Sequence, residues 1–87
     1  MRKHYLFRGL VQGVGFRWVA SRAAAMYGVS GFVRNLPDGS VEMEAEGSAA
    51  ALDKVLDCIR RGRFIEIDSL TEREIPERGD RGFHVAD

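Results

Sequence analysis

The sequence predicts an α+β sandwich, in which two helices cover one face of an antiparallel sheet. Two segments repeat apolar residues at the three- and four-residue spacing of an amphipathic helix, and four others are β-prone. These elements follow one another in the order βαββαβ, and we expect a short fifth strand near the C-terminus. The 87 residues, 45% of them hydrophobic and 30% charged, are typical of one small domain spanning residues 1–87.

The first strand and the first helix meet at a pair of glycines. Residues 5–11 are rich in aromatic and branched side chains and run into the tripeptide GVG at residues 13–15, which predicts a strand that ends in a turn. Gly28 lies where a left-handed C-cap would close the following helix. The helical stripe consists of Phe16, Val19, Ala20, Ala23, Met26 and Tyr27.

A hairpin follows the first helix. Residues 29–34 are β-prone, and the sequence LPDG at residues 36–39 supplies turn chemistry. In the next strand Val41, Met43 and Ala45 alternate with three glutamates. We expect the apolar residues to face inward and the glutamates to form a solvated row, because exposed carboxylates are far commoner than a metal site.

The second helix lies between Ser48, a good N-cap, and Gly62. Residues 64–75 alternate in a strand pattern that shifts register near residues 68–69, which predicts a bulge. Residues 83–85 form the expected short last strand. Two right-handed crossovers interleaved with a hairpin define the ferredoxin-like arrangement. The stripe of the second helix consists of Leu52, Val55, Leu56 and Ile59.

Charge and cysteine content exclude several classes of protein. Thirteen basic residues balance thirteen acidic ones, so the broad positive surface of non-specific nucleic-acid binding is not expected. The single Cys58 cannot form an internal disulfide, and the distant His4 and His84 lack metal-ligand spacing. The first apolar run is short and is broken by Arg8, so neither a signal peptide nor a membrane span is predicted. We expect a cytoplasmic protein without metal, cofactor, nucleic-acid or membrane partner.

The start of the first helix breaks the rules that the second helix keeps. No Ser, Thr, Asp or Asn precedes it, and Arg17 lies in its first turn, where the helix dipole disfavours a cation. Gly13 and Gly15 allow the free N–H groups of residues 13–17 to converge on one point. A bound phosphate would satisfy these donors and neutralise Arg17. Taken alone, a plain turn with Arg17 in solvent explains the pattern equally well.

Two sequence signatures point to a family. Neither the Walker motif nor the dinucleotide fingerprint is present. The first signature, GLVQGVGFR at residues 9–17, resembles the phosphate-binding signature of the acylphosphatases. The second, GFVRNLPDGSV at residues 31–41 with Gly47 beyond it, resembles their other signature. The resemblance extends to residues 82–83 and implies a single acylphosphatase-like domain over residues 1–87.

The resemblance implies a small, metal-independent hydrolase of acyl phosphates, which we expect to be a monomer. Such an enzyme releases a carboxylate and inorganic phosphate, and the phosphate is also a competitive inhibitor. Arg17 would bind the phosphoryl group, and Asn35 would orient the attacking water. Leu10 lies where many members carry a basic residue, which bears on substrate affinity. The backbone assigned to the anion cradle is that of Gln12, Gly13, Val14, Gly15 and Phe16.

The chemistry of acyl phosphates explains how so few residues could suffice. Phosphoryl transfer has a loose transition state that depends on positioning and charge stabilisation. The leaving carboxylate is weakly basic, with a conjugate-acid pKa of roughly 4 to 5 by analogy with Asp and Glu, so a general acid is not needed. Without the family signature, Asn35 would be interpreted as a turn residue. We assign Trp18 to packing, like Phe16, and give no catalytic role to Cys58, His4 or His84. The alternative function is a non-catalytic anion-binding or interaction module.

Overall fold

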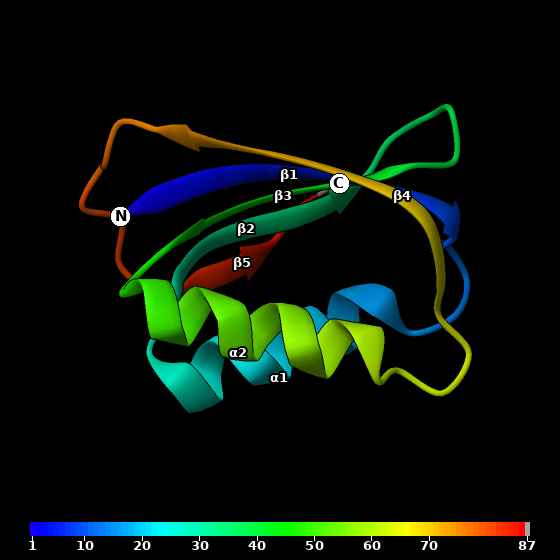
Figure 1. Cartoon of the computed structure of the whole chain (residues 1–87), viewed down its shortest axis with the longest axis horizontal. Coiled ribbons are helices and arrows are strands. Elements are labelled where there is room, and N and C mark those ends of the chain that lie inside the picture. Colours follow the sequence, from blue (N-terminus) through cyan, green and yellow to red (C-terminus); the bar gives the residue numbers. More distant parts are fainter. Residues whose placement is uncertain (87) are drawn as a thin grey trace.

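The computed structural model describes residues 1–86 and has the predicted α+β architecture. Two helices cover one face of a five-stranded sheet with the strand order β4-β1-β3-β2-β5 (Figure 1). The ferredoxin-like fold class is confirmed. The elements are β1 (Arg2–Leu10), α1 (Phe16–Tyr27), β2 (Ser30–Asn35), β3 (Val41–Glu46), α2 (Ala49–Arg60), β4 (Glu66–Ile75) and β5 (Phe83–Val85).

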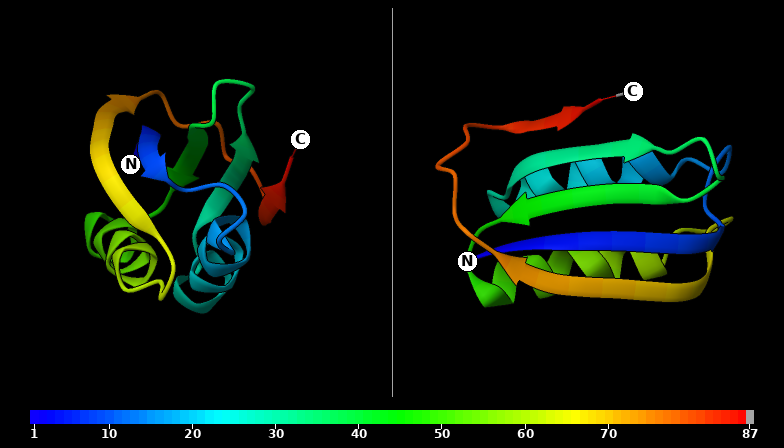
Figure 2. Two further views of the ribbon diagram at one scale, coloured as in Figure 1. Left: turned by 90° about the vertical axis from the view of Figure 1, so that its right-hand side faces the viewer. Right: turned by 90° about the horizontal axis from the view of Figure 1, so that it is seen from above.

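The short last strand exists as predicted, but it makes the sheet mixed. The pairs β1–β3, β1–β4 and β2–β3 are antiparallel, whereas β5 pairs in parallel with β2, with Gly31 opposite Phe83. The chain leaves β4 at the end of the sheet where β2 begins. It crosses that end and turns back along β2, so the two strands run in the same direction (Figure 2).

The bulge predicted near residues 68–69 is present and is one residue long. Arg8 pairs with Ser69 and Gly9 pairs with Ile67, so Asp68 is the extra residue of β4. Gly9 has φ 133°, and a Cβ at this position would lie 2.3 Å from the carbonyl oxygen of Glu66. The close approach of the two backbones therefore requires glycine.

The core lies between the helices and the inner face of the sheet. The alternation predicted for β3 is confirmed, because Val41, Met43 and Ala45 are fully buried. The stripe of α1 differs from the prediction at its end: Ala24 is buried, whereas Met26 is 65% exposed. Met26 borders a shallow groove between the two helices, and the small alanines make the closer contact with the core.

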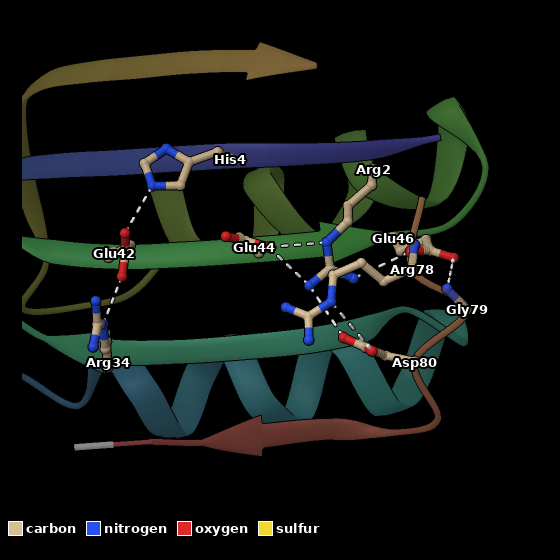
Figure 3. Close-up of polar contacts among 9 residues, drawn as sticks. All are labelled: Arg2, His4, Arg34, Glu42, Glu44, Glu46, Arg78, Gly79 and Asp80. Carbon is tan, nitrogen blue, oxygen red and sulfur yellow. Dashed lines mark hydrogen bonds and ion pairs between the residues drawn. The ribbon is translucent and has the colours of Figure 1, made fainter. Parts of the chain in front are cut away.

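The open face of the sheet carries a buried cation, and the prediction of a solvated glutamate row is wrong. Arg2 is fully buried, and its Nε donates to Glu44 at 2.9 Å while its Nη1 donates to Glu46 at 3.1 Å (Figure 3). Its Nη2 lies 3.1 Å from Asp80. The carboxylates therefore balance a charge that alternation along one strand could not reveal.

Glu42 and Glu46, at the two ends of the same row of glutamates, both have polar partners from other segments of the chain. Glu46 accepts the backbone N–H groups of Arg78, at 2.8 Å, and Gly79, at 3.1 Å, and these bonds lower the pKa of its carboxyl (Figure 3). Partial burial would raise the pKa of Glu42, but contacts with His4 and Arg34 outweigh it, so that the pKa is lowered. The Glu46 contacts hold the β4–β5 connection against β3, whereas the Glu42 contacts join β3 to β1 and β2.

Candidate active site

The loop between β1 and α1 has the open, donor-rich geometry that the two glycines predict. Gly13 has φ 73° and Gly15 has φ 81°, a left-handed conformation that suits glycine. Gly15 is the N-cap of α1, no described side chain caps this helix, and its first turn holds no acidic residue. The uncapped start predicted for the first helix is therefore present, and its N–H groups and dipole favour an anion.

A pocket of about 410 Å³ lies against this loop and brings the two principal candidates together. Arg17 reaches it from the first turn of α1, and Asn35 reaches it from the end of β2. The crossover from β1 through α1 to β2 therefore brings these two residues, which are distant in the sequence, to the same pocket. The lining residues are Val11, Gly13, Gly15, Phe16, Arg17, Trp18, Ser21, Asn35 and Val85.

Two other predicted residues, Gln12 and Val14, are not among the described residues that line the pocket. The side chain of Gln12 donates from Nε2 to the carbonyl oxygens of Leu36, at 2.8 Å, and Ser40, at 2.9 Å. Leu36 follows Asn35 directly, so the Gln12 amide sets the spacing between the loop and the strand end that carries Asn35. The sequence signature indicated a role only for the backbone of Gln12, and it carries no signal of this side-chain contact.

The hairpin beyond Asn35 is held by its own polar contacts. Ser40 donates to Asp38 from its backbone N–H at 3.0 Å and from its hydroxyl at 2.5 Å. These bonds, together with Arg8 at 3.2 Å, lower the pKa of Asp38. Asn35 itself pairs with Val41 in the β2–β3 ladder. The backbone that carries the Asn35 amide is therefore anchored on both sides.

Trp18 departs from the packing role that the sequence predicted. It is 64% exposed and lines the pocket next to Arg17, and the Arg22 guanidinium lies 4.9 Å from its ring centroid. Residues two apart lie about 200° apart around a helix, so burial of Phe16 already places Trp18 on the outer side. Ser21 shares a face with Arg17 four residues earlier. The helical period could therefore have placed both Trp18 and Ser21 beside Arg17. It could not have placed Val85, which lies on a separate strand.

A second groove, of about 760 Å³, shares the backbone of Gly13 and Gly15 with the loop pocket. Its lining includes Glu66 of β4, whereas the lining of the loop pocket includes Val85 of β5. The strands β4 and β5 form the two opposite edges of the sheet (Figure 2). No such groove was predicted from the sequence. Its other lining residues are Leu10, Val14, Arg63, Phe64 and Glu66.

The remaining reactive side chains lie elsewhere. Of the residues described, Cys58 is a partly buried free thiol in the groove between the helices, and neither His4 nor His84 lines the loop pocket. Within residues 1–86 no three His, Cys, Asp or Glu side chains gather in a way that could hold a metal ion. None of the described helices is long and apolar enough to span a membrane.

The fold and the pocket define a small ferredoxin-like protein with an uncapped, donor-rich loop beside an arginine and an amide. The acylphosphatase family model matches residues 3–85, so the chain belongs to the acylphosphatase family of enzymes. It is 51% identical over 59 residues to an acylphosphatase of Bordetella parapertussis, covering 68% of this chain and 63% of that relative. It is 42% identical over 81 residues to one of Thermus thermophilus, covering 92% of each. The crystal structure of acylphosphatase from Bacillus subtilis matches with a TM-score of 0.85 and 32% identity, covering 99% of this chain and 98% of that one.

Proposed function

We propose that this protein hydrolyses the carboxyl-phosphate bond of acyl phosphates without a metal ion. The observation that carries the proposal is that Arg17 and Asn35, far apart in the sequence, line one pocket at an uncapped helix start. Water attacks phosphorus, the bond between phosphorus and the acyl oxygen breaks, and a carboxylate and inorganic phosphate are released.

The phosphoryl group binds the backbone N–H groups of residues 12–16 and the Arg17 guanidinium. A helix start offers several N–H donors and a positive dipole end to one anion. A guanidinium adds two parallel hydrogen bonds to phosphate oxygens, which an ammonium cannot do in the same geometry. Because these groups are held in place before substrate arrives, they stabilise the charge that spreads over the equatorial oxygens in the transition state.

Asn35 holds the attacking water. A loose transition state needs the water in position more than it needs the water deprotonated. A neutral amide can accept and donate hydrogen bonds without repelling the incoming dianion, as a carboxylate would. The hydrogen bonds from the Gln12 side chain to the neighbouring hairpin carbonyls tie the strand end that carries the Asn35 amide to the loop.

The proposal is tested by measuring the hydrolysis of benzoyl phosphate by the purified protein in the presence of a chelator. We expect hydrolysis well above the spontaneous rate, unaffected by the chelator and competitively inhibited by inorganic phosphate. A rate equal to the spontaneous one would refute the proposal. Calorimetry that detected phosphate binding without turnover would instead favour the non-catalytic anion-binding module. We also propose that the protein acts as a cytoplasmic monomer, which light scattering and fractionation would check.

A further inference from the structure

We propose that the groove lined by Leu10, Arg63, Phe64 and Glu66 is the acyl subsite and that it selects acyl phosphates with an apolar or aromatic acyl group. This acyl groove and the phosphate pocket border the same glycine loop, share Gly13 and Gly15, and differ in their other lining residues. The inference rests on the proposed function and adds a substrate class to it.

The direction of phosphoryl transfer links the two hollows. The attacking and leaving oxygens lie roughly in line on opposite sides of phosphorus. Asn35 lines the loop pocket, and the described lining of the acyl groove does not include it. A phosphoryl group on the loop N–H groups, with its water at Asn35, therefore directs its acyl oxygen away from Asn35. The backbone of Gly13 and Gly15 borders both hollows, so the leaving group passes over it into the groove.

The arrangement of the chain agrees with this direction. Seen end-on, the loop lies between the start of β4 on one side and β5 on the other (Figure 2). Arg63 and Phe64 belong to the connection between α2 and β4, whereas Val85 of β5 lines the phosphate pocket. The two hollows, with volumes of about 410 and 760 Å³, thus meet at the loop and are lined from opposite edges of the sheet.

The lining of the groove sets the chemistry of its occupant. Leu10 is 51% exposed and Phe64 is 64% exposed, so an apolar acyl group would remove both from water. The Arg63 guanidinium lies 5.6 Å from the ring centroid of Phe64, which offers positive charge near a leaving carboxylate. Glu66 in the same lining disfavours a second anionic group on the acyl chain. A flat aromatic acid such as benzoate fits these conditions better than acetate.

The test compares kcat/KM for benzoyl phosphate and acetyl phosphate in the unmodified protein, Phe64→Ala and Phe64→Leu. We expect the unmodified protein to prefer benzoyl phosphate and Phe64→Ala to lose about tenfold of that preference, the usual scale for an apolar pocket contact. Phe64→Leu should retain part of it. The acetyl phosphate kcat/KM and the inhibition constant of inorganic phosphate should stay within about twofold, because the phosphoryl seat is untouched.

Met26→Ala, an exposed residue outside both hollows, is the matched control and should leave the preference unchanged. An equal loss for both substrates, or an unchanged ratio in Phe64→Ala, would overturn the acyl groove while the proposed hydrolysis stood. Hydrolysis of neither substrate by the unmodified protein would overturn the proposed function and, with it, this inference. Thermal unfolding of each variant verifies that the comparison is made on folded protein.

Discussion

The two helices have the same length and cover the same face of the sheet, yet their first turns are opposites. Helix α2 begins at Ser48, whose hydroxyl accepts the N–H of Ala51 at 3.1 Å, and ends with Arg60 in its last turn. Helix α1 begins at Gly15 without a described side-chain cap and carries Arg17 in its first turn. Both helices contribute to one core, so packing does not explain the difference. The difference agrees with the proposed function, in which the start of α2 serves structure alone and the start of α1 keeps its N–H donors available for the phosphoryl group.

The largest effect should follow replacement of Arg17. We expect Arg17→Ala to lower kcat/KM by about 100- to 1000-fold, the usual scale for one preorganised donor to a charged transition state. Arg17→Lys should recover little, because it lacks the paired donors of a guanidinium. Inhibition by inorganic phosphate should weaken in both variants. Arg22→Ala, five residues further along α1 and outside the described pocket lining, is the control. Near-normal kinetics in Arg17→Ala would contradict the assignment.

Replacement of Asn35 should separate binding from rate. We expect Asn35→Ala to lower kcat by about 100-fold, because a poorly placed reactant costs about that much. The inhibition constant of phosphate should change by less than about twofold, since the loop and Arg17 remain. Steady-state kinetics with phosphate as inhibitor measures both quantities. Equal losses in kcat and in phosphate affinity would mean that Asn35 binds the phosphoryl group rather than the water.

The capped helix should respond in the opposite manner. We expect Ser48→Ala to lower the free energy of unfolding by about 1 kcal/mol, the usual value of an N-cap, and to leave kcat/KM unchanged. Urea unfolding and the acyl phosphate assay, both at 25 °C, measure these effects. A loss of activity without a loss of stability would show that the two helix starts are not functionally distinct.

The smallest effect concerns acid. The pKa of Glu42 is lowered in the folded protein, so its stabilisation is present above the unfolded value of about 4.3 and is lost as the pH falls through the folded pKa. We expect the free energy of unfolding to decrease below about pH 4.3. Glu42→Gln should flatten that decrease, and Glu74→Gln on the edge strand β4 should not. Identical acid profiles for the two variants would remove Glu42 from the explanation.

Local chemistry accounts for most of what could be predicted. Periodicity and turn residues located both helices, the hairpin and a bulge near residues 68–69, because each depends on neighbours along the chain. The absence of a capping residue before Phe16 and the cation at position 17 marked the loop before any contact was known. The residue roles assigned to Arg17 and Asn35 stay predictions, although both side chains line the same pocket.

The contacts that could not be predicted from the sequence join residues from distant segments of the chain. Alternation in β3 indicated which way Glu44 and Glu46 face, but their pairing with Arg2 depends on β1 lying beside β3. Asp80 joins them only because the β4–β5 connection crosses the sheet. In the same way, Phe64 borders the glycine loop because α2 ends near it, which the spacing between residues 15 and 64 does not indicate.

The sequence by itself determined the order of the elements, the inward face of β3 and the unsatisfied start of the first helix. These properties follow from backbone geometry and from residues a few positions apart. Only the tertiary structure decided that Asn35 and Arg17 share a pocket, that Arg2 is neutralised by three carboxylates and that a second groove borders the loop. Such contacts depend on how strands and helices pack, and packing brings together residues whose separation along the chain carries no signal of their proximity.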